Sequence, residues 1–140
     1  MDGSDAAIFP YLPYILQDFW EIGASFSDIS FLIAEYMPEP ANCQVLDLGC
    51  GKGAVCVRLA EKFGCRCLGI DGIAEFIDDA RRKALEHGVG KLCEFRTGDI
   101  RQDIETLPEF DVIILGAIGP VFGNYRQTLT TLEPHLTEGG

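Results

Sequence analysis

The chain has 140 residues, 47% of them hydrophobic, which predicts one domain with a hydrophobic core. Its 11 basic and 22 acidic residues give a formal net charge of −11, and such a surface repels nucleic acid and anionic membranes, so neither is an expected partner. No apolar run approaches the ~20 residues of a membrane-spanning helix.

The first 40 residues predict two helices. An aromatic-rich segment predicts a short helix from Pro13 to Trp20, and a second helix begins at Ser27 and ends before Pro38. Aromatic side chains of this region either line a lid over a ligand or pack in the core: Tyr11, Tyr14, Phe19, Trp20 and Phe26.

Strand-like and helix-like segments alternate along the rest of the chain. The expected strands are 45–48, 65–70, 92–97 and 110–115, and the expected helices are 54–63, 73–87 and 125–136. This alternation with apolar strands predicts a parallel sheet covered by helices on both faces, with right-handed crossovers. We therefore expect an N-terminal helical cap in residues 1–40 and an α/β domain in residues 41–140, with a ligand crevice at the carboxyl ends of the strands.

The six cysteines contain no Cys-x-x-Cys pair, so we expect no metal site. Cys65 and Cys67 stand two residues apart in an expected strand, where they share one face and pack in the core. Buried free thiols are typical of a reducing compartment, and residues 1–7 are acidic and polar, unlike a signal peptide. The sequence therefore favours a cytoplasmic protein.

Residues 45–53 read Val-Leu-Asp-Leu-Gly-Cys-Gly-Lys-Gly, an apolar strand followed by three glycines at a spacing of two. The glycines let the backbone turn tightly and approach a ligand at the N-terminus of the next helix. The first two glycines and Ala54 also fit the dinucleotide fingerprint, so an NAD(P)-dependent oxidoreductase domain is the alternative. Asp47 weighs against it, because a carboxylate here repels a pyrophosphate and suits a cationic ligand. Gly53 also weighs against it, because it keeps the loop open for a wider ligand.

The motif resembles that of the class I S-adenosylmethionine-dependent methyltransferases, hydrophobic-hydrophobic-Asp-x-Gly-x-Gly-x-Gly, residue for residue, and the resemblance extends from Cys43 to Gly140. It implies a Rossmann-like three-layer αβα fold with the strand order 3-2-1-4. The family sheet has seven strands and this chain supplies four, so we expect a truncation before strand five. A fourth strand left at the edge of the sheet predicts self-association, for example as a homodimer.

The resemblance also implies roles for three acids that close strands or follow them. Asp47 is expected to face the methionine end of S-adenosylmethionine, where a sulfonium and an ammonium favour its ionised form. Asp71 is expected to accept hydrogen bonds from the ribose hydroxyls, or alternatively to form the turn before Gly72. Asp99 is expected to accept from the adenine amino group, or alternatively to cap the next helix.

Other expected contacts come from residues next to these acids and glycines. Ile73 packs on the adenine or simply within its helix, the backbone N–H of Ile100 meets the ring, and Gly116 lies beside the transferable methyl group. The complete set expected to bind the cofactor is Asp47, Gly49, Cys50, Gly51, Gly53, Asp71, Gly72, Ile73, Asp99, Ile100 and Gly116.

The residues that follow the fourth expected strand give information on the class of methyl acceptor. Residues 116–119 read Gly-Ala-Ile-Gly. They lack the Asn/Asp-Pro-Pro-aromatic sequence of enzymes that methylate exocyclic or side-chain amides, and the Pro-Cys pair of those that methylate cytosine carbon. Together with the acidic surface, this favours a small-molecule acceptor. Neither His87 nor His135 has an evident partner, so no catalytic base is assigned, and a non-catalytic nucleoside-binding domain is a further alternative.

Overall fold

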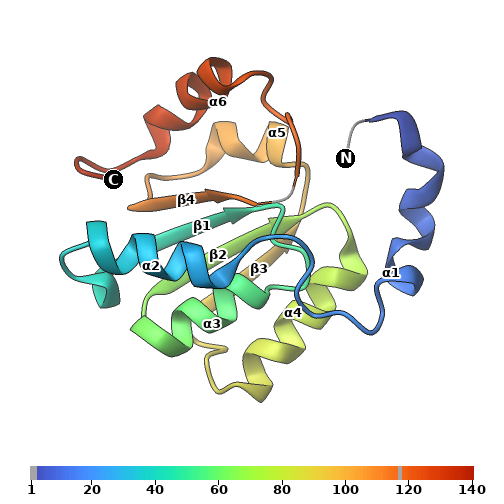
Figure 1. The fold of residues 1–140 in the computed structure, drawn as a ribbon, viewed down its shortest axis with the longest axis horizontal. Coiled ribbons are helices and arrows are strands. Elements are labelled where there is room, and N and C mark those ends of the chain that lie inside the picture. The colour runs from blue at the N-terminus through green and yellow to red at the C-terminus, as the bar shows by residue number, and fades with distance from the viewer. Residues whose placement is uncertain (1–2, 117) are drawn as a thin grey trace.

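The computed structural model describes residues 3–116 and 118–140, and a four-stranded parallel sheet lies at its centre (Figure 1). The strands follow the order β3-β2-β1-β4, which confirms the predicted order. Their bounds are Gln44–Leu48 for β1, Arg66–Asp71 for β2, Cys93–Thr97 for β3 and Val112–Leu115 for β4. The strand order reverses direction at β1, so the carboxyl ends of β1 and its neighbours define the expected ligand crevice.

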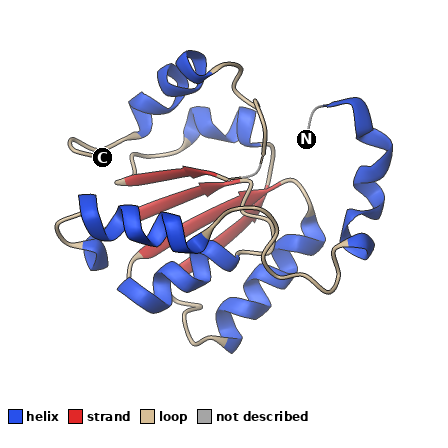
Figure 2. Cartoon of the chain, viewed as in Figure 1, coloured by secondary structure: helices blue, strands red, loops and turns tan. Residues whose placement is uncertain are grey.

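Helices cover both faces of the sheet, as Figure 2 shows. On one face lie α2 (Phe26–Tyr36), α3 (Ala54–Phe63) and α4 (Ala74–Glu86), and on the other lie α5 (Ile100–Asp103) and α6 (Tyr125–Leu132). Side chains of β1 point alternately into the two layers. Val45 joins the core beneath α2, α3 and α4, whereas Leu46 and Leu48 join the core on the opposite face. The three-layer αβα fold is thus confirmed.

The N-terminal region differs from the expected helix of residues 13–20. A 3₁₀ helix, η1 (Gly3–Tyr11), leads directly into a single turn of α-helix, α1 (Leu12–Ile15), and residues 16–20 form turns and a bend. The side chain of Lys52 donates to the carbonyls of Leu16 and Gln17, the two residues that follow α1, as described below. Tyr11, Tyr14 and Phe19 are exposed, while two other aromatics of this region pack against the core, Trp20 and Phe26.

Two other predicted boundaries shift at proline or at the sheet edge. The last helix ends at Leu132 rather than 136, because Pro134 lacks the backbone N–H that would continue it, and a 3₁₀ turn, η4 (Glu133–His135), follows. The fourth strand begins at Val112 rather than 110, and Phe110 instead forms an isolated parallel bridge with Leu136. Two further 3₁₀ turns are η2 (Pro40–Asn42) and η3 (Ile104–Thr106).

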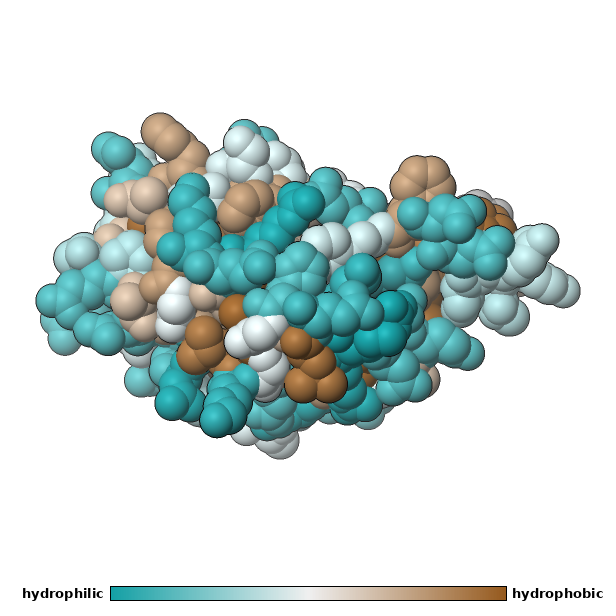
Figure 3. Space-filling view, turned by 90° about the horizontal axis from the view of Figure 1, so that it is seen from below, coloured by the Kyte–Doolittle hydropathy of each residue, from teal (hydrophilic) through white to brown (hydrophobic). Residues whose placement is uncertain are grey.

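The surface agrees with the acidic, polar composition. Hydrophilic side chains cover most of the face seen in Figure 3, with small hydrophobic areas between them. None of the described helices is both long and apolar enough to cross a membrane. The cysteines are free thiols, of which Cys93 is half-buried and five are buried, Cys43, Cys50, Cys56, Cys65 and Cys67. This confirms the prediction of core packing for Cys65 and Cys67.

Candidate functional site

The glycine loop between β1 and α3 adopts a backbone that few residues other than glycine accept. Gly49, Gly51 and Gly53 have φ angles of +78°, +54° and +74°. The N–H groups of Gly49 and Cys50 donate to the carbonyl of Ile70 at 2.8 and 3.1 Å, so the loop folds back on the end of β2. The tight turn expected from the three glycines is therefore present.

Gly53 serves the packing of α3 against α4 and β3. A Cβ atom at this position would lie 2.8 Å from the Cβ of Ala80 and 2.8 Å from the ring of Phe95. The space beside Gly53 thus belongs to the core between α3, α4 and β3, and its role in keeping the loop open for a ligand stays a prediction. Contact between its backbone and a cofactor stays a prediction.

Asp47 is a buried carboxylate at the carboxyl end of the central strand, 3% exposed. The thiol of Cys56 donates to one carboxylate oxygen of Asp47, with 3.7 Å between sulfur and oxygen. A thiol is a weak donor, so this bond stabilises the charged carboxylate only slightly. Burial, with a smaller contribution from the charge of Asp71, raises the pKa of Asp47 to about 7. Within residues 3–116 and 118–140 no ion pair includes Asp47, so a bound cation would be its natural partner.

Asp71, at the end of β2, holds two pieces of backbone. One carboxylate oxygen accepts from the N–H of Gly51 at 2.9 Å, and the other accepts from the N–H of Ile73, also at 2.9 Å. Burial raises the pKa of Asp71, although these backbone bonds oppose the shift. The turn-forming role considered for Asp71 is confirmed. Each oxygen keeps a second lone pair, so the ribose role stays a prediction.

Asp99 follows β3 and caps α5. Its side chain accepts from the backbone N–H of Arg101 and from the guanidinium Nε of the same residue, both at 3.1 Å. The Arg101 side chain holds the pKa of Asp99 below its usual range. The capping role considered for Asp99 is confirmed, and its contact with adenine stays a prediction. Two neighbours expected at the adenine are half-buried, Ile73 and Ile100, whereas Gly72 is exposed.

Side chains of the protein itself cover the glycine loop and Gly116. A Cβ on Gly51 would lie 2.8 Å from Cδ1 of Ile22, and one on Gly116 would lie 2.8 Å from the Cβ of Ala24. Gly49 faces Ile118 in the same way. A cavity of about 20 Å³ remains, room for about one water molecule, and is lined by Trp20, Glu21, Ile22, Ala24, Asp47, Gly49, Cys50, Ala54 and Val55.

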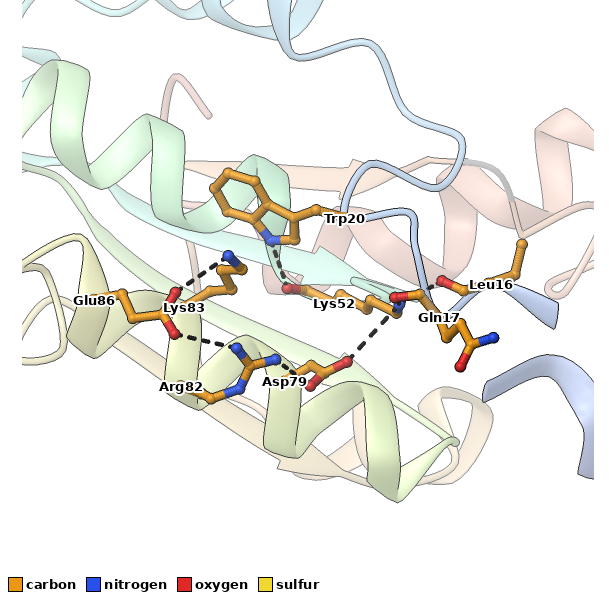
Figure 4. A network of polar contacts seen from close by, with 8 residues as sticks. All are labelled: Leu16, Gln17, Trp20, Lys52, Asp79, Arg82, Lys83 and Glu86. Carbon is orange, nitrogen blue, oxygen red and sulfur yellow. Dashed lines mark hydrogen bonds and ion pairs between the residues drawn. The ribbon is translucent and has the colours of Figure 1, made fainter. Parts of the chain in front are cut away.

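Lys52 connects the glycine loop to the N-terminal segment (Figure 4). Its ammonium, on a residue only 4% exposed, donates to the carbonyl of Leu16 at 2.5 Å and to that of Gln17 at 3.3 Å. It also lies 3.8 Å from Asp79 of α4. In return, the indole Nε1 of Trp20 donates to the carbonyl of Lys52 at 3.0 Å.

Sequence reasoning missed Lys52, Ile22, Ala24 and Ile118. The only sign for Lys52 was its place inside the glycine motif, and no pattern marked the three apolar residues. Neither histidine lines the cavity. His87 pairs with Glu61 at 2.9 Å, and one ring nitrogen of His135 lies 3.2 Å from the carbonyl of Leu107. Ala117, in the loop after β4, lies outside the described residues.

A parallel sheet of order 3-2-1-4, a glycine loop after β1 and acids at or just beyond the ends of three adjacent strands define a Rossmann-like nucleoside-binding domain. Residues 39–140 match the model of a family described as a methyltransferase domain, and the chain belongs to that family. This match favours the methyltransferase interpretation over the oxidoreductase alternative.

Relatives within this family act on different kinds of substrate. The chain is 31% identical over 74% of its length to the trans-aconitate 2-methyltransferase of Deinococcus radiodurans. It is 30% identical over 81% of its length to the tRNA 5-carboxymethoxyuridine methyltransferase of Escherichia coli. These matches cover 38% and 42% of the two relatives, so the chain spans less than half of either.

The fold resembles solved structures of the same class. The S-adenosylmethionine-dependent methyltransferase of Thiobacillus denitrificans, crystallised with S-adenosylhomocysteine, matches 92% of this chain with a TM-score of 0.79 and 26% identity. A methyltransferase from Geobacter sulfurreducens with the same ligand matches 94% of it with a TM-score of 0.77. The chain covers 52% and 53% of these two structures.

Proposed function

We propose that this chain binds S-adenosylmethionine at the carboxyl ends of its strands and is part of a methyltransferase that acts on a small molecule. The observation that carries the proposal is Asp47, a buried carboxylate beside the glycine loop whose charge no cation of the described residues balances. The donor brings an ammonium and a sulfonium, and either cation would favour the ionised form of Asp47.

The residues proposed for the ribose and the adenine lie at or just after the carboxyl ends of the neighbouring strands β2 and β3. Asp71 would hold the ribose, while Asp99, Ile73 and Ile100 would surround the adenine. Their chemistry fits this ligand, since Asp71 has acceptor lone pairs beyond those used by the backbone and the isoleucines are half-buried apolar side chains. The space does not fit while Ile22 covers the loop, so the N-terminal segment must move for the ligand to bind.

The donor supplies a methyl group on a sulfonium, which is a good leaving group. The residues of this chain would then bind the donor, orient it through the acids and the glycine loop, and exclude water with the N-terminal segment. No described side chain at the site qualifies as a general base, and none is assigned. Methyl transfer from a sulfonium needs one only if the acceptor must lose a proton.

Support for a small-molecule acceptor comes from the net charge of −11, which disfavours contact with a nucleic acid backbone. The trans-aconitate methyltransferase is named for a small-molecule acceptor. The tRNA methyltransferase is named for an RNA acceptor, so RNA is the alternative that an experiment must test.

We also propose a cytoplasmic location, because the buried free thiols suit a reducing compartment.

Calorimetric titration of the chain with S-adenosylmethionine, S-adenosylhomocysteine and NAD tests the cofactor. Saturable binding of the two sulfur nucleosides without NAD is expected, and binding of NAD alone would overturn the proposal. The acceptor is then sought with methyl-labelled donor, offering a pool of small carboxylic acids and amines in one reaction and total tRNA in another. Label in the tRNA alone would refute the small-molecule acceptor, and binding of donor without transfer to either would favour a non-catalytic domain.

A further inference from the structure

Lys52 lies within the glycine motif, but its side chain extends away from the glycine loop toward the N-terminal segment. Its ammonium reaches the carbonyls of Leu16 and Gln17, at the point where α1 ends. The last carbonyls of a helix lack partners within it and attract a positive charge. Lys52 is therefore placed to hold the end of α1 against the glycine loop, 36 residues further along the chain.

The same residue holds the segment a second time through its backbone. The indole of Trp20 donates to the carbonyl of Lys52 at 3.0 Å, so residues 16–20 are fixed at both ends by one residue (Figure 4). Asp79 on α4, 3.8 Å from the ammonium, faces it from the opposite side. In Figure 1, η1 and α1 lie at the margin of the molecule, away from the sheet. The residues that follow have further contacts, since Glu21 pairs with Arg58 and the ring of Trp20 packs against His87.

Residues 16–20 are attached to Lys52, and the residues that follow them cover the glycine loop of the donor site. Ile22 lies over Gly51 and Ala24 over Gly116, and the cavity that remains measures about 20 Å³. Pockets for cofactors have volumes of about 300–1,000 Å³. The methionine end of the donor can reach the glycine loop only if the segment lifts, and lifting breaks or rearranges the contacts of Lys52.

We propose that Lys52 is a positioning residue that clamps a lid, defined as residues 16–24, over the donor site, and that the donor nucleoside enters and leaves when this clamp opens. The inference deepens the proposed function and rests on it. The clamp suits a reversible lid, because the open lid exposes the ammonium and the two carbonyls to water, which replaces the bonds that are lost. A neutral residue in place of Lys52 removes its bonds to both carbonyls in the closed state, although the carbonyl of Leu16 keeps the N–H of Phe19, and so favours the open state.

Trp20 is the only tryptophan of the chain and lies inside the lid, so its fluorescence reports the position of the lid without a label. The first measurement is acrylamide quenching of Trp20 without ligand, in the wild-type chain and in Lys52→Met. We expect Trp20 to be quenched more readily in the variant. Lys62→Met is the control, since it also removes one lysine, and its ammonium donates to Ser30 of α2 rather than to the lid.

The second measurement is the rate of S-adenosylhomocysteine binding and release, followed by the same fluorescence in stopped flow. In Lys52→Met we expect faster entry and release faster by about tenfold or more, the effect of losing hydrogen bonds to a charged group. Lys52→Arg keeps the charge and should restore slow release, because a groove of about 230 Å³ beside Lys52 has room for the longer side chain.

The outcomes separate the clamp from the proposed function. Unchanged quenching and unchanged release in Lys52→Met would overturn the clamp, whether or not the donor binds. If the wild-type chain binds no sulfur nucleoside, the donor role fails, and increased quenching in the variant would then show a clamp that serves some other site. Should Lys52→Met not fold, hydrogen exchange of residues 16–24 in the wild-type chain replaces it. Slower exchange with S-adenosylhomocysteine supports the lid, and equal exchange refutes it.

Discussion

The carboxylate of Asp71 accepts a hydrogen bond from the backbone N–H of Gly51 at 2.9 Å and so joins the end of β2 to the glycine loop after β1. Its second oxygen accepts from Ile73 at the start of α4. One side chain therefore fixes the positions of two segments that are expected to meet the donor. Substitution of Asp71 acts on the shape of the site as well as on any ribose contact.

We expect Asp71→Ala to lower both stability and donor affinity. The free energy of unfolding should fall by about 1–3 kcal/mol, because two backbone N–H groups lose their acceptor. S-adenosylhomocysteine should bind at least about tenfold more weakly, because the ribose loses an acceptor as well. Urea unfolding and calorimetry measure the two effects.

Asp78→Ala is the control for this experiment, since Asp78 is an exposed acid on α4 that pairs with Arg81 on the surface. Its removal should change stability by less than about 0.5 kcal/mol. Unchanged stability in Asp71→Ala would refute the anchoring role. Unchanged affinity in a folded Asp71→Ala would refute the ribose assignment.

Gly53 and Gly64 allow the cost of a left-handed backbone to be separated from the cost of a steric clash. Their φ angles are nearly equal, +74° and +76°, but a Cβ on Gly64 would meet nothing within 4 Å, whereas one on Gly53 would press on Ala80 and Phe95. Gly64→Ala should destabilise the chain by about 1–2 kcal/mol, and Gly53→Ala by about a further 1–3 kcal/mol. Equal losses in thermal or urea unfolding would contradict the tight packing beside Gly53.

The parts of the molecule that were predictable from the sequence are those that local patterns encode. The apolar run of Val45, Leu46 and Leu48 predicts a strand buried on both faces. The alternation of strands and helices, together with the family resemblance, predicted its place in the sheet. Positive φ angles follow from glycines at a spacing of two. The capping role of Asp99 and the turn at Asp71 were foreseen as alternatives, because acids after strands commonly bind nearby N–H groups.

A lid of N-terminal aromatic residues was one of two alternatives, but the contacts that hold residues 16–24 were not predictable, because they join residues far apart in the sequence. The helix expected over 13–20 stops at Ile15, and the carbonyls of the next two residues accept from Lys52, a residue far along the chain. Nothing in the pattern around Ile22 indicates that it will lie over Gly51. A buried lysine is uncommon, and composition alone cannot show that its ammonium will find three oxygen partners.

The burial of Asp47 makes the stability of the chain depend on pH. Its pKa is about 7 in the folded chain, against an ordinary value of 3.8, so the folded state holds the proton more strongly than the unfolded state. Ionisation of the buried Asp47 therefore lowers the free energy of unfolding of the chain. This loss is absent below about pH 4, grows as the pH rises and is complete above about pH 7. Asp47→Asn should therefore become more stable relative to the wild type across this window. A constant difference between the two unfolding curves would contradict it.

The same group should govern donor binding. The ligand ammonium lies beside its own carboxylate, which holds its pKa above the value of about 7.7–8.0 for a peptide N-terminus. Between about pH 5.5 and 7.5 the main change at this contact is therefore the ionisation of Asp47. Affinity for S-adenosylhomocysteine should rise with pH over this range, as the carboxylate forms, and should be nearly flat in Asp47→Asn. Cys56 and Asp71 also face this carboxyl, and the thiol of Cys56 lowers its pKa, so Cys56→Ala should keep a rise of affinity with pH but move it to higher pH. A flat wild-type profile would refute the contact between Asp47 and the ammonium.

Asp99 offers a test of the adenine assignment that its capping role does not affect. If its carboxylate accepts from the adenine amino group, S-inosylhomocysteine should bind the wild type about 10- to 100-fold more weakly than S-adenosylhomocysteine, because a carbonyl replaces the amino donor and repels the carboxylate. Asp99→Asn can still accept from the N–H of Arg101, so the cap survives, and its amide can donate to the new carbonyl. The ratio of the two dissociation constants should therefore shrink or reverse in the variant. An equal ratio in both chains would place the adenine elsewhere and leave Asp99 as a helix cap.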